Sequence, residues 1–262
     1  MLTIIVCIKQ VYDPEAPLSL FRLDPDGRSL VPPPGTPPVL SPFDENALEA
    51  ALRIKEELGA RVIAVSMGYK LAKPVLKKAL AAGADDLILL DDVLFDGLDS
   101  YGTSRVLEKA IKKIGNADLV LCGRQAADTD AGQVGPTLAE CLGIPAITLA
   151  RKVKLLPEGV WVERLLPDGY EVVEGSLPLL ITVSQEVGEL RFPPVKAVLA
   201  AQKKAVTVWN AEELGVSDAI VQRSKLSRLY VPERENHCEM IGWESPEQVA
   251  DVLAALLETR LG

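Results

Sequence analysis

The regular alternation of strand-like and helix-like segments over residues 1–150 is the feature that most constrains the fold. It begins at residues 2–10 (LTIIVCIKQ), an apolar, β-branched run typical of a strand buried on both faces of a sheet. Residues 41–59 follow with apolar positions at helical spacing and a glycine at the expected C-terminal cap. Repeated alternation of this kind predicts a doubly wound, Rossmann-like parallel sheet in an α/β protein. The further predicted strands are 60–68, 85–92, 117–123 and 144–150, and the further predicted helices are 73–83, 100–115 and the second half of 129–143.

The rhythm changes after residue 150. Four short apolar segments (KVKLL, VWVERLL, EVVEG and LPLLITVS) are separated by turn sequences containing Pro and Gly, which predicts an antiparallel C-terminal addition to the same sheet. Near the other end, an Asp-Gly pair within residues 21–31 predicts a hairpin. Residues 245–262 predict a helix that Ser245 caps. We therefore expect an α/β nucleotide-binding domain over residues 1–206 and a C-terminal arm over residues 207–262 that packs on a partner subunit.

Composition argues against several classes of protein. The formal net charge of −9 disfavours binding to nucleic acid, and no apolar run approaches the roughly 20 residues of a membrane-spanning helix. The chain contains one histidine, His237, which we expect to be a surface or packing residue. Its four cysteines lack metal-ligand spacing, which predicts reduced thiols in a cytoplasmic protein. We expect neither catalytic nor metal-binding residues.

A polar loop rich in glycine, residues 123–135 (GRQAADTDAGQVG), joins a predicted strand to a predicted helix. In a doubly wound sheet, ligands bind past the carboxyl ends of the strands, where residues 7–11, 41–44 and 66–69 are also expected. Glycines let the backbone approach an anion closely, and free amides at a helix N-terminus donate to it. The loop has neither a Walker A nor a GxGxxG pattern. A phosphate site and an ordinary strand–helix connection therefore both remain open.

Two groups of side chains also have two interpretations each. Asp128 and Asp130 suit a metal or acid–base pair, or the commoner role of forming a turn and capping a helix. In SPFDENA, Ser41 or Asp44 is expected to cap the helix that follows. The alternative places Phe43 in the crevice, where an aromatic side chain lies against a planar ring.

Several segments match a known family in the same order along the chain. The most specific are the GRQAADTDAGQVGP loop at 123–136 and ELRFPPVKAVLAAQKK at 189–204. The others are VCIKQV at 6–11, SPFDENALEAALRIKE at 41–56, VIAVSMG at 62–68, KALAAGADDLILL at 78–90, VERLLPDGYEVVEGSLPLLITV at 162–183 and WNAEELGV at 209–216. Together they cover most of residues 1–216 and resemble the β subunit of electron transfer flavoproteins.

The resemblance implies an adenine nucleotide alpha hydrolase-like fold and a heterodimer with the α subunit of an electron transfer flavoprotein. That subunit would hold most of a redox FAD, with Phe43 in contact near the isoalloxazine. It also implies a nucleotide in this chain, which is AMP in the common form and a second FAD in electron-bifurcating members. The DTDAGQVGP string is closer to the bifurcating form, so both stay open. The positions that match the family's pocket are Cys7, Ser41, Pro42, Phe43, Asp44, Met67, Gly123, Arg124, Gln125, Ala126, Ala127, Asp128, Thr129, Asp130, Ala131, Gly132, Gln133 and Val134.

The resemblance further implies that electrons come from acyl-CoA and related dehydrogenases and pass toward the quinone pool through an oxidoreductase. The family's docking segment for dehydrogenases falls on residues 184–205, with Val195 at the anchor position. This chain departs from the family in the docking segment. The family often has the string Asn-Glu-Pro-Arg-Tyr there, whereas residues 188–192 of this chain read Gly-Glu-Leu-Arg-Phe.

Two other classes share the expected architecture. One is a nucleotide-binding regulatory module that works without a flavoprotein partner. The other is a nucleotide-activating ligase or hydrolase, which needs basic phosphate clamps or metal-binding carboxylates in the crevice. Arg124 is the only clear basic candidate in the loop. A yellow complex on co-expression with an α subunit would separate the carrier from both.

Overall fold

The computed structural model describes residues 1–216, 222–231, 240, 242 and 245–261. The chain divides into two compact units, Met1–Ser227 and Arg228–Gly262. The first unit continues past the predicted boundary at residue 206 because the strand β13 (Thr207–Trp209) pairs with the main sheet. In the second unit, helix α7 (Pro246–Leu261) agrees with the predicted terminal helix, and the Oγ of Ser245 accepts from the N–H of Gln248 at 3.3 Å.

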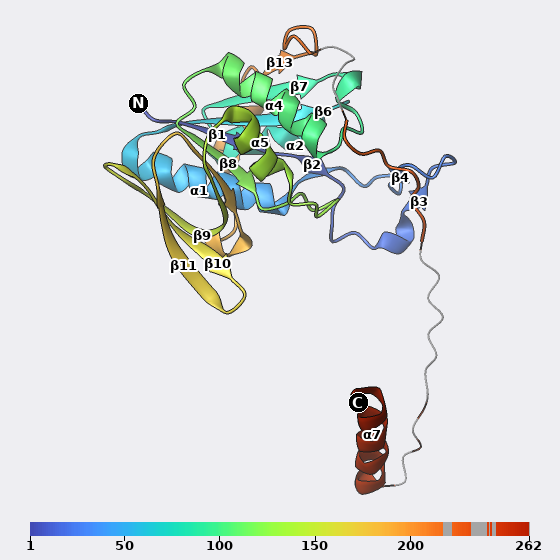
Figure 1. Cartoon of the computed structure of the whole chain (residues 1–262). Coiled ribbons are helices and arrows are strands. Elements are labelled where there is room, and N and C mark those ends of the chain that lie inside the picture. Colours follow the sequence, from blue (N-terminus) through green and yellow to red (C-terminus); the bar gives the residue numbers. More distant parts are fainter. Residues whose placement is uncertain (217–221, 232–239, 241, 243–244, 262) are drawn as a thin grey trace. The chain divides into compact units, whose positions relative to one another are not determined.

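Nine strands of the described chain form one sheet, in the order β11-β10-β9-β12-β8-β1-β6-β7-β13 (Figure 1). Each neighbouring pair in the part of the sheet that runs β9-β12-β8-β1-β6-β7-β13 is parallel. The β9–β10 and β10–β11 pairs are antiparallel. This confirms the predicted doubly wound sheet with an antiparallel addition. The strands are β1 (Thr3–Cys7), β6 (Arg61–Gly68), β7 (Asp86–Asp91), β8 (Leu119–Gly123), β9 (Ala146–Leu156), β10 (Gly159–Leu166), β11 (Gly169–Gly175) and β12 (Leu179–Val183).

Helices cover both faces of the sheet. Helix α1 (Pro42–Leu58) packs on one face, and α4 (Ser100–Ile114) and α5 (Val134–Leu142) pack on the other (Figure 1). The predicted helix 73–83 is two short helices, α2 (Lys73–Leu76) and α3 (Lys78–Ala82), on the α1 face. Helix α6 (Val195–Lys203) packs beside α3. The connections also contain the short helices η1 (Leu18–Leu20), η2 (Val93–Phe95) and η3 (Gln185–Val187).

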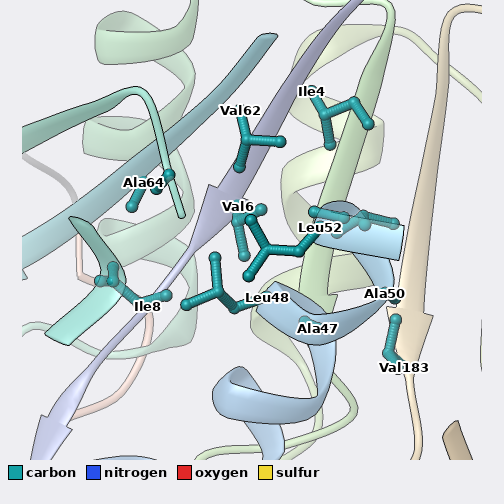
Figure 2. Packing of buried hydrophobic residues seen from close by; sticks show 14 of the residues in the cluster. Ile4, Val6, Ile8, Ala47, Leu48, Ala50, Leu52, Val62, Ala64 and Val183 are labelled. Atoms are coloured by element: carbon teal, nitrogen blue, oxygen red, sulfur yellow. The ribbon is translucent and has the colours of Figure 1, made fainter. Parts of the chain in front are cut away.

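The apolar face of α1 makes the central contact with the sheet. Figure 2 shows Ala47, Leu48 and Leu52 of α1 against Val6 of β1 and Val62 of β6. All five side chains are buried, and Leu48 is fully buried. Gly59, at φ 72°, ends the helix in the left-handed conformation, as the sequence predicts. Burial of this face fixes the start of α1 at the carboxyl edge of the sheet.

Two expectations for the C-terminal addition require correction. The segment LPLLITVS forms β12, which is parallel and lies inside the sheet between β8 and β9, so the antiparallel part is limited to β9–β11. All five residues of β12 are buried, which explains why four of them are apolar. The separately predicted strands 144–150 and KVKLL are one strand, β9, with a positive φ of 59° at Leu149.

Smaller predictions have mixed outcomes. Residues 21–31 form the expected hairpin between β3 (Arg22–Leu23) and β4 (Leu30–Val31), and β2 (Gln10–Val11) pairs with β5 (Val39–Leu40). Cys7, Cys122 and Cys141 are free thiols. His237 and Cys238 lie outside the described residues. Among the described helices, none has the length and apolar character needed to cross a membrane.

Candidate functional site

The candidate site lies where the strand order of the sheet reverses. From β1 the chain adds β6 and β7 on one side, whereas β8 pairs with the opposite edge of β1. The loops that leave the carboxyl ends of β1 and β8 therefore diverge to opposite faces, and their divergence forms the usual ligand crevice of a doubly wound sheet. The loop after β8, residues 123–135, is called the Gly-rich loop below.

Asp44, in the first turn of α1, joins three segments at this point. Its Oδ2 accepts from the backbone N–H of Lys9 at 2.8 Å, and its Oδ1 accepts from the N–H of Gly123 at 3.1 Å. The Nζ of Lys9 in turn contacts the carboxylate of Asp128 at 2.6 and 2.9 Å. The end of β1, the start of α1 and the Gly-rich loop are thus connected through one buried carboxyl group.

Burial and hydrogen bonding have opposite effects on the carboxyl group of Asp44. Burial raises its pKa from 3.8 to about 7, and the N–H groups of Lys9 and Gly123 reduce that rise because they favour the anion. Gly123 is required at this contact. A Cβ at residue 123 would lie 2.6 Å from Oδ1 of Asp44 and 2.7 Å from the carbonyl carbon of Phe43.

The second half of the Gly-rich loop presents unpaired amides at the start of α5. Thr129 and Asp130 donate to the carbonyl of Ala126 and form a turn, whereas residues 131–135 donate to no acceptor in the described chain. Residues 128–133 are exposed, and Gly132 has a φ of 63°. Free N–H groups at the positive end of a nine-residue helix suit an anion.

Phe43 and Arg124 form a stacked pair at the edge of the crevice. The guanidinium carbon of Arg124 lies 4.9 Å from the ring centroid of Phe43. Both side chains are half-buried, and the backbone N–H of Arg124 donates to the carbonyl of Val183. The pair presents a planar cationic and aromatic surface beside the unpaired amides.

The donors at this edge fit a nucleotide. The Oγ atoms of Ser41 and Ser66 and the Nε of Arg124 are buried and have no hydrogen-bond partner in the described chain. Ser41 precedes α1 and Ser66 lies near the end of β6, so both belong to the carboxyl edge of the sheet. Buried polar groups are normally paired. Their lack of partners, with the free loop amides, suits a polar ligand such as a phosphoribosyl group.

The expected caps are wrong. Ser41 precedes α1 without a side-chain capping bond, and the carboxylate of Asp44 binds the N–H groups of Lys9 and Gly123 instead of capping the helix. Neither aspartate of the Gly-rich loop caps α5, which Gln133 precedes. Asp128 pairs with Lys9, and Asp130 accepts from the Nε2 of Gln125 at 2.8 Å.

Two further predicted site residues lie at the same edge of the sheet. Met67, near the end of β6, and Cys7, the last residue of β1, both pack in the cluster on the α4 face. The adjacent Cys7 thiol and burial raise the pKa of Cys122 well above its usual range, which disfavours a nucleophilic role. Two surface hollows lie elsewhere, one beside Ile111 and Pro178 and one at the turn between β9 and β10.

Sequence reasoning missed the role of Lys9. It also assigned Asp44 to local capping. The available signal was the position of Lys9 just after a buried strand, because a charged residue there faces the ligand edge. Its pairing with Asp128, 119 residues away, needed the topology.

The predicted docking segment contains exposed apolar side chains. Val195, at the first position of α6, is 76% exposed, and Phe192 is 94% exposed. Large apolar side chains with this exposure, grouped on one segment, are typical of interaction surfaces.

The fold and the site define a doubly wound α/β protein with free main-chain donors at its switch point. A model of the electron transfer flavoprotein domain matches residues 35–214. The electron transfer flavoprotein subunit β of Thermoanaerobacterium thermosaccharolyticum is 44% identical over 216 residues, which cover 82% of this chain and 81% of the relative. The caffeyl-CoA reductase-Etf complex subunit CarD of Acetobacterium woodii is 37% identical and covers 98% of both chains, and the subunit β of Clostridium acetobutylicum is 38% identical over the same share. The chain belongs to the electron transfer flavoprotein family and is a β-type subunit, which confirms the resemblance.

Proposed function

We propose that this chain is the β subunit of a heterodimeric electron carrier. In this proposal the partner is the α subunit of an electron transfer flavoprotein, which holds most of an FAD. Electrons arrive from acyl-CoA and related dehydrogenases and leave toward the quinone pool through an oxidoreductase. The flavin supplies the electron chemistry when bound, and the residues of this chain orient and enclose it. The chain has no catalytic role of its own.

The Gly-rich loop holds the phosphate of a nucleotide within this chain in the proposal. The observation that supports it most is the set of unpaired amides at residues 131–135, at the positive end of α5. Ser41, Met67 and Cys7 line the rest of the site, and the nucleotide is AMP or a second FAD. The 37% identity to a subunit of the caffeyl-CoA reductase-Etf complex keeps the second FAD in the proposal.

Extraction of the bound nucleotides tests both the carrier role of the chain and the nucleotide site in the Gly-rich loop. The chain is co-expressed with an α subunit, the complex is denatured, and the released nucleotides are weighed by mass spectrometry and counted per heterodimer. One FAD with one AMP supports the common form, and two FAD support the bifurcating form. A colourless chain that carries only an adenine nucleotide and ignores the α subunit would support a regulatory module instead.

A substitution of Phe43 tests its place beside the flavin. Phe43→Ala is expected to change the flavin absorbance or potential in the heterodimer while the chain stays folded, because the ring lies at the edge of the crevice. Tyr170→Ala is the control, since Tyr170 is a 52% exposed aromatic residue on the β10–β11 hairpin. Unchanged flavin properties in Phe43→Ala would remove the proposed contact.

A further inference from the structure

Arg191 fixes the segment before α6 to helix α1. Its Nε and Nη2 donate to the two carboxylate oxygens of Glu49, each at 3.0 Å, and its backbone N–H donates to Glu49 at 3.1 Å. The guanidinium also pairs with the carboxylate of Glu56, about two helical turns further along α1. Bidentate arginine–carboxylate pairs fix orientation as well as distance.

Other side chains of α1 extend this attachment. Arg53 donates to the carbonyl of Val187 at 2.8 Å, and Asn46 donates to the carbonyl of Gly188 at 2.6 Å. Glu49 is 4% exposed. Burial favours a raised pKa for Glu49, but the hydrogen bonds from Arg191 and Arg53 outweigh it and hold the pKa below the usual value. The carboxylate is therefore a buried anion that depends on Arg191 for its main partner.

The far end of the segment is also fixed. Ala201 of α6 is buried, the Nζ of Lys77 donates to the carbonyl of Gln202 at 2.6 Å, and Lys204 donates to the carbonyl of Asp85. Between the two attachments the apolar side chains point outward: Phe192 is 94%, Val195 76% and Leu199 61% exposed. The exposed apolar group thus lies on backbone that is attached at both ends.

We propose that Arg191 is a positioning residue for the docking of a redox partner. Its network with Glu49 and Glu56 holds the backbone so that Phe192 and Val195 are already placed for an apolar pocket on a dehydrogenase. Helix α1 carries this network and, in its first turn, Phe43, so one 17-residue helix sets the docking segment relative to the candidate flavin contact. The inference rests on the proposed function, which assigns docking to residues 184–205.

The energetic reason is preorganisation. If only a fraction of the molecules has the segment ordered for binding, the apparent dissociation constant equals the intrinsic constant divided by that fraction. If loss of the network lowers that fraction to about one tenth, the apparent affinity falls about tenfold. The chemical step after docking is unaffected, so the effect falls on KM and not on kcat.

The test uses the complete heterodimer with an acyl-CoA dehydrogenase as electron donor. KM for the flavoprotein and kcat are measured for Arg191→Met, Val195→Ala and the control Lys78→Met. Lys78 forms a comparable ion pair with Glu45 of α1 and lies outside the docking segment. Because Arg191→Met leaves Glu49 buried without its partner, the double variant Glu49→Gln/Arg191→Met is measured as well. Hydrogen exchange of residues 187–194 reports the order of the segment directly.

We expect KM to rise about tenfold in both Arg191 variants with kcat within a factor of two, and hydrogen exchange of residues 187–194 to accelerate. Lys78→Met is expected to behave as the unmodified complex. If Val195→Ala raises KM and the Arg191 variants do not, docking stands and the positioning role is overturned. If no variant changes KM, the assignment of docking to this segment is overturned with it. A fall in kcat alone in the Arg191 variants would also contradict positioning.

Discussion

Asp44 is a residue on which two opposing effects act at once. Two backbone N–H groups favour its anion, and burial among the segments that it connects favours the neutral acid. The outcome is a pKa of about 7, close to neutral pH. A group in this state couples the Gly-rich loop to pH, because its protonated form loses an acceptor that one of the two amides requires.

Asp44 is expected to make the stability of the chain decrease between about pH 4 and pH 7. The folded chain binds this proton more tightly than the unfolded chain, since the pKa is raised from 3.8 to about 7. Its contribution is therefore fully present below pH 3.8 and is lost as the pH rises through 7, a change of roughly 4 kcal/mol in unfolding free energy. Chemical denaturation at pH 5 and pH 7.5 measures the part of this change between those two values, roughly 2.5 kcal/mol. Asp44→Asn should abolish this part of the difference, and an unchanged pH dependence in the variant would contradict the assignment.

Gly123 is expected to tolerate no side chain. An alanine Cβ at this position would lie 2.7 Å from the backbone of Phe43, which cannot move without shifting the start of α1. We expect Gly123→Ala to lower the unfolding free energy by about 1–3 kcal/mol and to reduce the nucleotide retained on purification. Gly169→Ala is the matched control, because a Cβ there meets nothing within 4 Å. Equal stability of the two variants would show that the loop relaxes freely around residue 123.

Helix α1 is the element on which the site and the docking segment both depend. Its buried stripe fixes it to β1, β6 and β12, so its first turn is held at the carboxyl edge of the sheet (Figure 2). Leu48→Ala removes a fully buried side chain and is expected to cost about 2–5 kcal/mol of unfolding free energy. Leu58→Ala, the same substitution at a 58% exposed position of the same helix, is expected to change it by less than about 1 kcal/mol. Thermal and chemical denaturation of both variants compares them, and a small loss in Leu48→Ala would contradict the central role of this contact.

The elements were predictable from sequence where local pattern determines them. A few neighbouring residues were enough to predict three features: β1 from its β-branched run, α1 from its apolar stripe, and the end of α1 from the glycine that follows it. The position of β12 was not predicted, because its apolar run indicates burial on both faces but does not say which strands it lies between, and it follows the antiparallel strands β10 and β11 along the chain. The same holds for the site. The glycines and helix start after β8 identified the Gly-rich loop, but the contacts of Asp44 with Lys9 and Gly123 join residues 35 and 79 positions apart.

At the scale of the whole molecule, the chain contains a compact unit and a separate terminal segment. The first unit ends at Ser227, and residues 223 and 224 are attached to the rest of it through Asp99, whose carboxylate accepts from the N–H groups of Arg223 and Ser224 at 2.7 Å each. Asp99 also accepts from Gly102 in the first turn of α4 at 2.8 Å. This attachment fixes where the chain leaves the first unit. None of the described residues beyond Ser227 belongs to either core cluster of that unit, and we propose that residues 228–262 serve assembly with the α subunit.

A chain that ends at Ser227 is expected to keep its own fold and to lose affinity for the α subunit. The first unit contains the complete nine-stranded sheet and both core clusters, so its thermal midpoint should match that of the full chain. If the terminal segment packs on the partner, its removal should weaken the heterodimer at least about tenfold, or 1.4 kcal/mol. Analytical ultracentrifugation of the two chains with the α subunit measures the difference. A truncated chain that assembles with unchanged affinity would place the subunit contacts within residues 1–227 alone, and one that fails to fold would show that the terminal segment stabilises the first unit directly.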